Sequence, residues 1–415
     1  MKTHPQHVTI VGASLAGANV AIGLREEGFD GAITMVGAEP RLPYERPPLS
    51  KGLLRGETSP EDADVKPPSF YRDAGIDLRS GVRAEQVDVA SRNVHLAGGE
   101  TLPYDRLVMT TGGRPKRPSI PGIDLAGIHT LRTVDDALAI RAEAGSAHHA
   151  VIVGLGFIGS EVAASLRASG MDVTAIEGAA TALDGPLGRQ VGQLVEGMHR
   201  DHGVRLVLGD GVSRFDGTDM VERVLTSSGR IIEGDLVVVG LGMQPNVEPV
   251  LGTTVQTSNG IVVDEFGRTS VEGIYAAGDV ANHWHPIGRQ HLRVEHWTNA
   301  VKQGRAVARE IVGRGQPYDD IPFFWSEHYG TELQYYGLQG SWDDVVIRGD
   351  LDGRDFVAMY QDEGRVVGAV AMGRPAELKV ARQLIASRAR VPRARLRDED
   401  LELATIGLAD VGSAA

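Results

Sequence analysis

The sequence of 415 residues predicts an α/β protein with two parallel βαβ units of the doubly wound kind and an α+β C-terminal domain. Two stretches, beginning at Val8 and Ala150, each run from a β-branched strand through a glycine-rich turn into a helix and a second apolar strand. From Ile321 onward, several strand patterns precede one helical pattern, which indicates a separate domain. The length agrees with two to three domains.

Composition excludes several classes of protein. The net charge of −13 argues against nucleic acid as a general partner. The chain has no cysteine, which excludes disulfides, redox dithiols and cysteine-ligated metal sites, and we expect a cytoplasmic protein without metal. The uncharged run from Val8 to Leu24 is interrupted by glycine, serine and asparagine, so it fits a nucleotide-binding turn better than a signal peptide or membrane span. No membrane association is expected.

The first βαβ unit begins with a strand from Val8 to Val11. The turn Gly12-Ala13-Ser14-Leu15-Ala16-Gly17 follows, then a helix to about Glu27 and a strand from Ile33 to Val36 that ends near Glu39. Ser14 stands where such turns usually have their middle glycine. Serine is small, and its hydroxyl can contact a phosphate.

The second unit carries a complete dinucleotide fingerprint. Its strand, Val151 to Val153, ends in Gly154-x-Gly156-x-x-Gly159, and its next strand closes on Glu177, 21 residues after Gly156. The glycines permit a sharp turn, close approach of a pyrophosphate and tight helix–strand packing. Glu177 can accept both ribose hydroxyls and repels a 2′-phosphate. Because residues 178–180 offer no cation, the sequence favours NADH over NADPH.

Two dinucleotide folds in one chain indicate two nucleotides, and one pyridine nucleotide with one flavin would supply a hydride donor and acceptor. Between them, Arg46-Pro47-Pro48-Leu49-Ser50-Lys51 holds two cations on a rigid backbone. Arg46 is placed at the FAD phosphates and Lys51 at the flavin ring. The alternative is a rigid loop with solvated cations.

The remaining patterns define the domain order. A buried strand from Tyr104 runs into a glycine turn that we interpret as the first crossing between domains, and residues 243–246 mark the return. Asp279 ends a strand where it can accept a hydrogen bond from a ribityl hydroxyl, or cap a helix with no ligand.

The predicted domains are a discontinuous FAD domain (1–114 and 243–320), an NAD domain (115–242) and a C-terminal domain (321–415). Other predicted elements are a helix at 136–143 capped by Thr133 or Asp135, strands at 204–208, 221–226, 236–242, 273–280, 344–347, 356–360 and 365–371, and helices at 295–312 and 376–387.

In these residues and their spacing, the chain resembles the FAD-dependent NADH:ferredoxin reductases, which serve cytochromes P450 and aromatic-ring dioxygenases. Their wider structural family resembles glutathione reductase and has two Rossmann-like domains. The motifs that carry the resemblance, in order, are GASLAG at Gly12, RPPLSK at Arg46, TTGGRP at Thr110, LRT at Leu131, GLGFIGSE at Gly154, GLGMQPN at Gly240, YAAGD at Tyr275, EHWTNA at Glu295 and PFFWSE at Pro322.

The resemblance implies the two cofactor sites residue by residue. Non-covalent FAD would contact Gly12, Ser14, Leu15, Ala16, Gly17, Glu39, Arg46, Lys51, Ala84, Arg132, Asp279, Glu295, His296, Trp297 and Trp325. NADH would contact Gly154, Gly156, Phe157, Ile158, Gly159, Glu161, Glu177 and Gly242. The family often has an acid directly after Gly37, where this chain has Ala38, so the ribose contact shifts to Glu39.

The resemblance also implies the chemical roles. The predicted catalytic residues are Lys51, Glu161 and Glu295. The two acids would flank the nicotinamide, and Glu161 would lie near Lys51. Phe157 resembles the aromatic that covers the flavin until nicotinamide displaces it, and Trp325 the aromatic at the flavin edge. The structural alternative for Phe157 is a core aromatic. For Glu161 it is an acid in the first turn of a helix, stabilised by the helix dipole.

The expected partner is a [2Fe–2S] ferredoxin that passes electrons to a cytochrome P450 or Rieske-type oxygenase. Such ferredoxins are typically acidic, so we expect a basic docking face. Arg305, Arg309 and Arg314 form a helical stripe, and residues 374–397 contain eight basic residues and one acid. The alternative to a docking face is an ordinary solvated face. The alternatives to the ferredoxin reductase function are a rubredoxin or small-molecule reductase and an NADH-sensing module resembling apoptosis-inducing factors.

Overall fold

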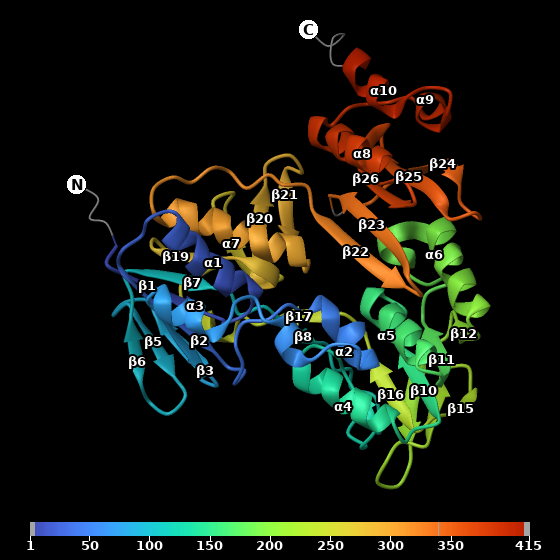
Figure 1. Ribbon diagram of the computed structural model, residues 1–415, viewed down its shortest axis with the longest axis horizontal. Helices are drawn as coiled ribbons and strands as arrows, with labels where there is room; N and C mark the ends of the chain where they lie inside the picture. Colours follow the sequence, from blue (N-terminus) through green and yellow to red (C-terminus); the bar gives the residue numbers. More distant parts are fainter. Residues whose placement is uncertain (1–4, 339, 411–415) are drawn as a thin grey trace. The chain divides into compact units, whose positions relative to one another are not determined.

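The computed structural model describes residues 5–338 and 340–410, which form two compact units. The first unit contains residues up to Glu45, Ala63–Arg114 and Gln244–Phe324, and the second contains Arg46–Asp62, Pro115–Met243 and the chain from Trp325 onward. Figure 1 labels the elements along the chain. Four elements span the unit boundaries: η2 (Pro60–Ala63), β8 (Gly113–Pro115), β17 (Met243–Pro245) and β22 (Phe323–His328).

The first unit is built on a five-stranded parallel sheet in the order β19-β7-β1-β2-β3. Two smaller sheets accompany it, β4-β5-β6 and β18-β20-β21. Its elements are β1 (His7–Val11), α1 (Leu15–Glu26), β2 (Ala32–Gly37), α3 (Pro68–Asp73), β3 (Ile76–Ser80), β4 (Ala84–Asp88), β5 (Asn93–Leu96), β6 (Thr101–Pro103), β7 (Arg106–Met109), η3 (Glu248–Val250), β18 (Ile261–Val263), β19 (Ile274–Ala276), η4 (Gly278–Val280), β20 (Ala281–His285), β21 (Gln290–Arg293) and α7 (Trp297–Ile311).

Alternation along the central strands divides the core of the first unit between the two faces of its sheet. Leu107 and Met109 belong to one apolar cluster, whereas Val108 belongs to the other. Ile274 and Tyr275 on β19 divide in the same way. Buried side chains on both faces explain why these strands read as continuous apolar runs.

The second unit repeats this plan with a parallel sheet in the order β12-β11-β10-β16-β9 and an antiparallel ribbon β13-β14-β15. Val151, Val153 and Val239 pack with Phe215 and Val224 of the ribbon. Its elements up to residue 243 are η1 (Pro47–Ser50), α2 (Gly52–Arg55), β9 (Ile128–His129), α4 (Val134–Ala144), β10 (His149–Val153), α5 (Phe157–Ala168), β11 (Asp172–Glu177), α6 (Asp184–Asp201), β12 (Arg205–Leu208), β13 (Val212–Asp216), β14 (Arg223–Thr226), β15 (Ile231–Glu233) and β16 (Leu236–Val239).

The C-terminal part of the second unit is a five-stranded sheet in the order β22-β23-β26-β25-β24, followed by helices. Its further elements are β23 (Thr331–Gly337), β24 (Asp344–Asp350), β25 (Asp355–Asp362), β26 (Arg365–Met372), α8 (Pro375–Ser387), α9 (Arg393–Arg397) and α10 (Leu403–Asp410). The predicted fold class, two Rossmann-like domains and a C-terminal α+β domain, is therefore confirmed. No helix within the described residues is long and apolar enough to cross a membrane.

Local differences from the predicted elements have clear causes. The strand predicted at 273–280 ends at Ala276, because Gly278 adopts a φ of 76° and the chain turns into η4. Thr133, and not Asp135, caps α4, since its side chain accepts from the Asp136 N–H while the Asp136 carboxylate accepts from the Thr133 N–H. The predicted division into three domains, with crossings after residues 114 and 242, stays a prediction.

Candidate functional site

The two glycine-rich turns are built alike, one in each unit. The Gly12 N–H donates to the Val36 carbonyl at 2.8 Å, and the Gly154 N–H donates to the Ile176 carbonyl at the same distance. Both bonds tie the end of the first strand of a βαβ unit to the end of its second strand. The carboxyl ends of β1 and β10 therefore open in the same way toward the first turn of the following helix.

Steric contacts show why both turns require glycine. Gly12 and Gly154 have φ values of 116° and 95°, and a Cβ at either position would overlap a backbone carbonyl, of Thr110 or Gly240 respectively. A Cβ on Gly17 would collide with the Gly12 carbonyl, and one on Gly159 with the Gly154 carbonyl. At Gly156, by contrast, a Cβ would meet no atom within 4 Å. This open position at the start of α5 suits a pyrophosphate on the helix N-terminus.

Glu177 is fastened to the second turn. Its Oε2 accepts the Leu155 N–H at 2.7 Å and its Oε1 accepts the Ala179 N–H at 2.8 Å. Both carboxylate oxygens keep further lone pairs for hydroxyl donors. The acid is thus held beside the glycine turn by two backbone N–H groups.

The first turn of α5 has a half-buried Phe157 and an exposed Ile158, whose relative exposure is 47%. Exposed apolar side chains at a helix N-terminus offer a surface for a planar ring. Gly242 adopts a φ of 91° and accepts the Lys116 N–H at 2.8 Å. Lys116 is an exposed cation beside this turn that the sequence patterns did not indicate.

The first-unit turn differs in its polar groups. Ser14 precedes α1 in an extended conformation, and its side chain makes no capping hydrogen bond, so the hydroxyl is not committed to the helix. Glu39 lies beyond the end of β2 and accepts a hydrogen bond from the Tyr44 hydroxyl. The acid of this unit is therefore held by a side chain, whereas Glu177 is held by two backbone N–H groups.

Further predicted contacts of the first unit cluster around η4 and the start of α7. Asp279 lies inside η4, whose N-cap is Ala277, so the alternative of a capping aspartate does not apply. His296 caps α7 with its backbone, packs against Phe324 with ring centroids 4.6 Å apart and has a buried Nδ1 without a hydrogen-bond partner. Burial lowers the His296 pKa to about 4. An orphaned polar atom of this kind fits a ligand that supplies the missing partner.

Three further first-unit residues were predicted to contact FAD: Glu295, Trp297 and Ala84. Glu295 is exposed and accepts from Arg293 at 2.5 Å. Trp297 is the first residue of α7, and Ala84 begins β4. Glu295 and Glu161 belong to different units, so their predicted arrangement on two sides of the nicotinamide stays a prediction.

Lys51 and Glu161 form a buried ion pair in the second unit. The Lys51 Nζ lies 2.6 Å from Glu161 Oε2, with side-chain exposures of 14% and 4%. Ser50 donates to the same oxygen at 2.5 Å, and Ser326 of β22 donates to Oε1 at 2.7 Å. A buried ion pair is stable only when additional hydrogen bonds satisfy its remaining polar atoms, and the two serines do this here.

Two buried histidines extend this polar cluster. His328 Nε2 lies 3.4 Å from the Ser326 hydroxyl, and His199 contacts Ser160 at 2.6 Å and Tyr329 at 2.8 Å. Burial, reinforced by the nearby Lys51 cation, lowers the His328 pKa to about 4. Burial, reinforced by the neighbouring histidines, lowers the His199 pKa to about 3. Both imidazoles are therefore neutral, and the ion pair is the charged part of the cluster.

Three further residues of the second unit were predicted to contact FAD: Arg46, Arg132 and Trp325. Arg46 donates to the backbone carbonyl of Arg132, which brings together two residues assigned to FAD. Trp325 is half-buried on β22, next to Ser326. Strand alternation gives Trp325 and Ser326 opposite directions.

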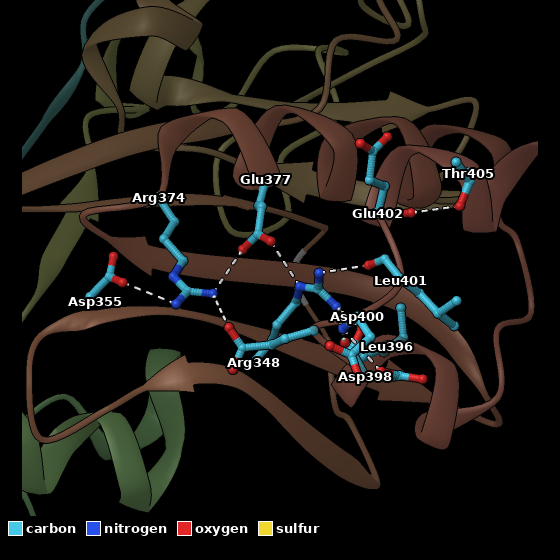
Figure 2. A network of polar contacts seen from close by, with 11 residues as sticks. Arg348, Asp355, Arg374, Glu377, Leu396, Asp398, Asp400, Leu401, Glu402 and Thr405 are labelled. Carbon is cyan, nitrogen blue, oxygen red and sulfur yellow. Dashed lines mark hydrogen bonds and ion pairs between the residues drawn. The ribbon is translucent and has the colours of Figure 1, made fainter.

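The predicted docking residues are partly neutralised. Arg305 donates to Glu26 at 2.9 Å and to Asn19 at 3.1 Å, whereas Arg309 is half-buried in the last turn of α7 and has no ion pair among the residues that the structure covers. In the C-terminal cluster, Arg374 contacts Asp355, Glu377 and Glu399, as Figure 2 shows in part. Arg390 and Arg393 pair with acids elsewhere on the sheet, Glu363 and Asp344. The face is thus less basic than its local sequence indicates.

The structure brings together some predicted residues and adds others. It joins Lys51 to Glu161, joins Arg46 to Arg132 and places Glu177 against the glycine turn. Sequence patterns assigned no role to Ser50, Ser326 or His328. Ser50 and Ser326 each adjoin a predicted site residue in the motifs RPPLSK and PFFWSE, which is the signal that could have identified them.

Comparison with known proteins agrees with this geometry. A family model described as pyridine nucleotide-disulphide oxidoreductase matches residues 6–304, and a reductase C-terminal model matches residues 323–407. Rhodocoxin reductase of Rhodococcus erythropolis is 36% identical over 95% of this chain and 93% of its own length. The ferredoxin reductase component of chlorobenzene dioxygenase from a Cupriavidus species is 37% identical over 99% of each chain.

A solved structure shows the same fold over the whole chain. The reductase in the covalent putidaredoxin reductase–putidaredoxin complex is similar with a TM-score of 0.94 and 33% identity, over 99% of this chain and 100% of that chain.

Proposed function

Because the chain belongs to the ferredoxin reductases of the pyridine nucleotide-disulphide oxidoreductase family, we propose that it is an FAD-dependent NADH:ferredoxin oxidoreductase. Family membership implies use of a flavin and NAD(P). The proposal is more specific: the protein would hold FAD non-covalently and oxidise NADH, and a [2Fe–2S] ferredoxin that serves a cytochrome P450 or a ring-hydroxylating oxygenase would receive single electrons.

The observation that carries the proposal is the pair of matched glycine turns, one in each unit. Gly12 and Gly154 make equivalent hydrogen bonds, and Gly17 and Gly159 permit equivalent helix contacts. Two dinucleotides in one chain supply a hydride donor and acceptor, and a chain without cysteine has no dithiol to take the electrons further. An electron acceptor outside this chain follows from this combination.

The residues of the second unit fit NADH. In the proposal, the first-turn N–H groups of α5 bind the pyrophosphate, and Glu177 accepts the ribose hydroxyls. The fixed Glu177 carboxylate would repel a 2′-phosphate, and this supports NADH over NADPH. Phe157, Ile158 and Gly242 would line the path of the dinucleotide toward its nicotinamide.

The residues of the first unit fit FAD. The uncommitted Ser14 hydroxyl and the turn Gly12–Gly17 would hold its pyrophosphate, and the orphaned Nδ1 of His296 suits a polar ligand atom. When bound, FAD supplies an acceptor for hydride and a donor of single electrons. Glu161 fixes the Lys51 ammonium. In the proposal, Lys51 would provide a positive charge for the isoalloxazine ring, and Glu161 would lie beside the nicotinamide.

The electron acceptor is inferred from the relatives. The similar solved structure is a complex with putidaredoxin, and the chlorobenzene relative is named as a dioxygenase component. In the proposal, Trp325 lies at the flavin edge, and Arg309 and Arg305 contribute to docking of an acidic ferredoxin. A cytoplasmic location stays a prediction from the cysteine-free sequence.

Cytochrome c reduction by NADH, with and without added [2Fe–2S] ferredoxins, tests the proposal. Strong stimulation by one ferredoxin and a clear preference for NADH over NADPH are the expected results. Stimulation by rubredoxin or a quinone alone would assign a different acceptor. Slow turnover with every acceptor, together with a persistent complex of reduced protein and NAD⁺, would instead indicate an NADH-sensing module.

A further inference from the structure

Glu161 is held from both of its carboxylate oxygens by residues of different elements. Lys51 and Ser50, at the end of η1, contact Oε2 at 2.6 and 2.5 Å. Ser326, which comes from the C-terminal sheet, contacts Oε1 at 2.7 Å. All of these residues belong to the second unit, and Ser326 is fully buried.

We propose that Ser326 and His328 are positioning residues that hold the carboxylate plane of Glu161 in one orientation for NADH. This inference rests on the proposed function, because it gives Glu161 a place beside the nicotinamide. Neither residue is inferred to touch a cofactor; both act through Glu161.

Torsional freedom explains why Ser326 is needed. The terminal torsion of a glutamate side chain is broad and roughly twofold, so donors on a single oxygen leave the carboxylate free to rotate about that contact. Lys51 and Ser50 both donate to Oε2 of Glu161. A third donor on the opposite oxygen fixes the plane, and Ser326 is that donor.

His328 completes the chain by orienting the Ser326 hydroxyl. A serine has one hydroxyl proton, and Ser326 gives it to Glu161, so the contact with His328 at 3.4 Å must use an Nε2–H donor and an Oγ lone pair. The His328 Nδ1 is buried without a hydrogen-bond partner, which agrees with an unprotonated nitrogen at that position. The neutral Nε2–H tautomer is therefore the form that directs the Ser326 proton toward Glu161.

Flavin reduction by NADH in an anaerobic stopped-flow experiment tests the inference. In S326A, we expect the limiting reduction rate to fall about tenfold or more, because small misplacements of reacting groups have large effects. The dissociation constant of NADH should change less than about threefold, since the pyrophosphate and ribose contacts are intact. S326T retains the hydroxyl and should restore most of the rate.

A double-mutant cycle with E161Q separates positioning from a general structural effect. If Ser326 acts through Glu161, S326A should have little further effect in the E161Q background. Full additivity of the two changes would overturn the inference, as would a wild-type rate in S326A. T226V is the matched control, because Thr226 is a buried hydroxyl of the same unit that contacts Ser228 and the Arg230 N–H but not Glu161.

A spectroscopic measurement distinguishes failure of this inference from failure of the proposed function. ¹⁵N NMR of histidine-labelled, flavin-loaded protein without NADH should show His328 as the Nε2–H tautomer, with a changed Nε2 resonance in S326A. The opposite tautomer would overturn the positioning role. Absence of any flavin reduction by NADH in the wild-type protein would contradict the proposed function while the tautomer result still tests the inference.

Discussion

The carboxylate of Glu177 accepts the backbone N–H of Leu155 at 2.7 Å, so the acid that closes β11 is bonded directly to the glycine turn that follows β10. Its other oxygen accepts the Ala179 N–H at 2.8 Å. The same side chain thus stabilises the turn, and both of its oxygens keep further lone pairs. Glu39 of the first unit accepts from the Tyr44 hydroxyl instead.

Replacement of Glu177 should weaken NADH binding and reduce nucleotide discrimination. In E177A, we expect the NADH dissociation constant to rise about ten- to a hundredfold, because hydrogen bonds to a charged acceptor are each worth about 1.5–3 kcal/mol. The preference for NADH over NADPH should narrow because the repulsion of a 2′-phosphate is lost. Fluorescence titration with both nucleotides measures this. D172A is the control, since Asp172 is an exposed acid at the other end of β11, and equal effects of the two changes would contradict the assignment.

Charge reversal of Arg309 should weaken coupling to ferredoxin. We expect the ferredoxin-dependent rate of R309E at low salt to fall about fivefold or more, with a shallower dependence on salt, because like charges oppose docking. The rate of ferricyanide reduction should not change. R72E makes an equal change of charge at an exposed position of α3 and should behave as wild type.

Arg305 requires a different variant, because reversal would also break its pair with Glu26. R305Q and E26Q both break that pair, so comparison of the two isolates the docking contribution. We expect weakened coupling in R305Q alone. Unchanged coupled rates in both R309E and R305Q would remove α7 from the docking surface.

Arg348 should be essential for the stability of the C-terminal part of the chain. Its side chain, 4% exposed, donates to Glu377 at 2.8 Å, to the Leu401 carbonyl at 2.7 Å and to the Asp398 carbonyl, as Figure 2 shows. In R348M, the Glu377 carboxylate keeps only its 3.4 Å contact with Arg374, and two backbone carbonyls lose a donor, so we expect destabilisation of about 2–4 kcal/mol. Hydrogen exchange over residues 393–406 should accelerate, which mass spectrometry measures.

R365A is the matched control for this change. Arg365 is also an arginine of the C-terminal sheet, but it is more exposed and forms a 3.4 Å pair with Glu363. Such a pair is worth at most about 1 kcal/mol. Equal destabilisation by R348M and R365A would show that the buried contacts of Arg348 are not what holds this segment.

Acid should destabilise the protein through its buried histidines. The His199 pKa is lowered to about 3 by burial, so the folded protein keeps this ring neutral while the unfolded chain binds a proton near pH 6.5. The contribution of neutral His199 to the free energy of unfolding is therefore complete above pH 6.5 and is lost as the pH falls from there toward 3. At pH 5 the free energy of unfolding is about 2 kcal/mol lower than at neutral pH because of this group.

Urea unfolding of the flavin-loaded protein between pH 7.5 and pH 5 measures this dependence. The variant H199Q should be less stable at pH 7.5 but should lose less stability on acidification than the wild type. H148Q, at an exposed histidine, is the control. An unchanged pH dependence in H199Q would show that His199 does not contribute to the acid sensitivity.

Local sequence was sufficient for the two βαβ units because their signals are contained within short stretches. Val8–Val11 and Val151–Val153 are apolar strands, and Gly12 and Gly154 follow them where a positive φ is required. A positive φ without steric cost is a property of glycine itself, so it can be read without a structure. Thr133 was one of two candidate caps of α4, and only the observed hydrogen bonds selected it.

The local charge, in contrast, also depends on acids that lie on other strands of the sheet. Residues 374–397 contain a single acid in sequence, but Arg374 and Arg393 meet Asp355 and Asp344 from β25 and β24. Sequence counts consider neighbours along the chain, whereas ion pairs depend on neighbours in space. Neither β22 nor β23 was among the strands predicted from the sequence.

The sequence alone determined the two glycine-rich turns, the position of Glu177 and the absence of a thiol redox centre, because each depends on residue type and short-range spacing. Only the tertiary structure decided how Glu161 is held. Ser50, Lys51 and Ser326 are more than a hundred residues away from Glu161 in the chain and meet it only because η1, α5 and β22 pack together. Such a buried polar cluster requires complementary donors from several elements, and only the packed fold brings those donors together.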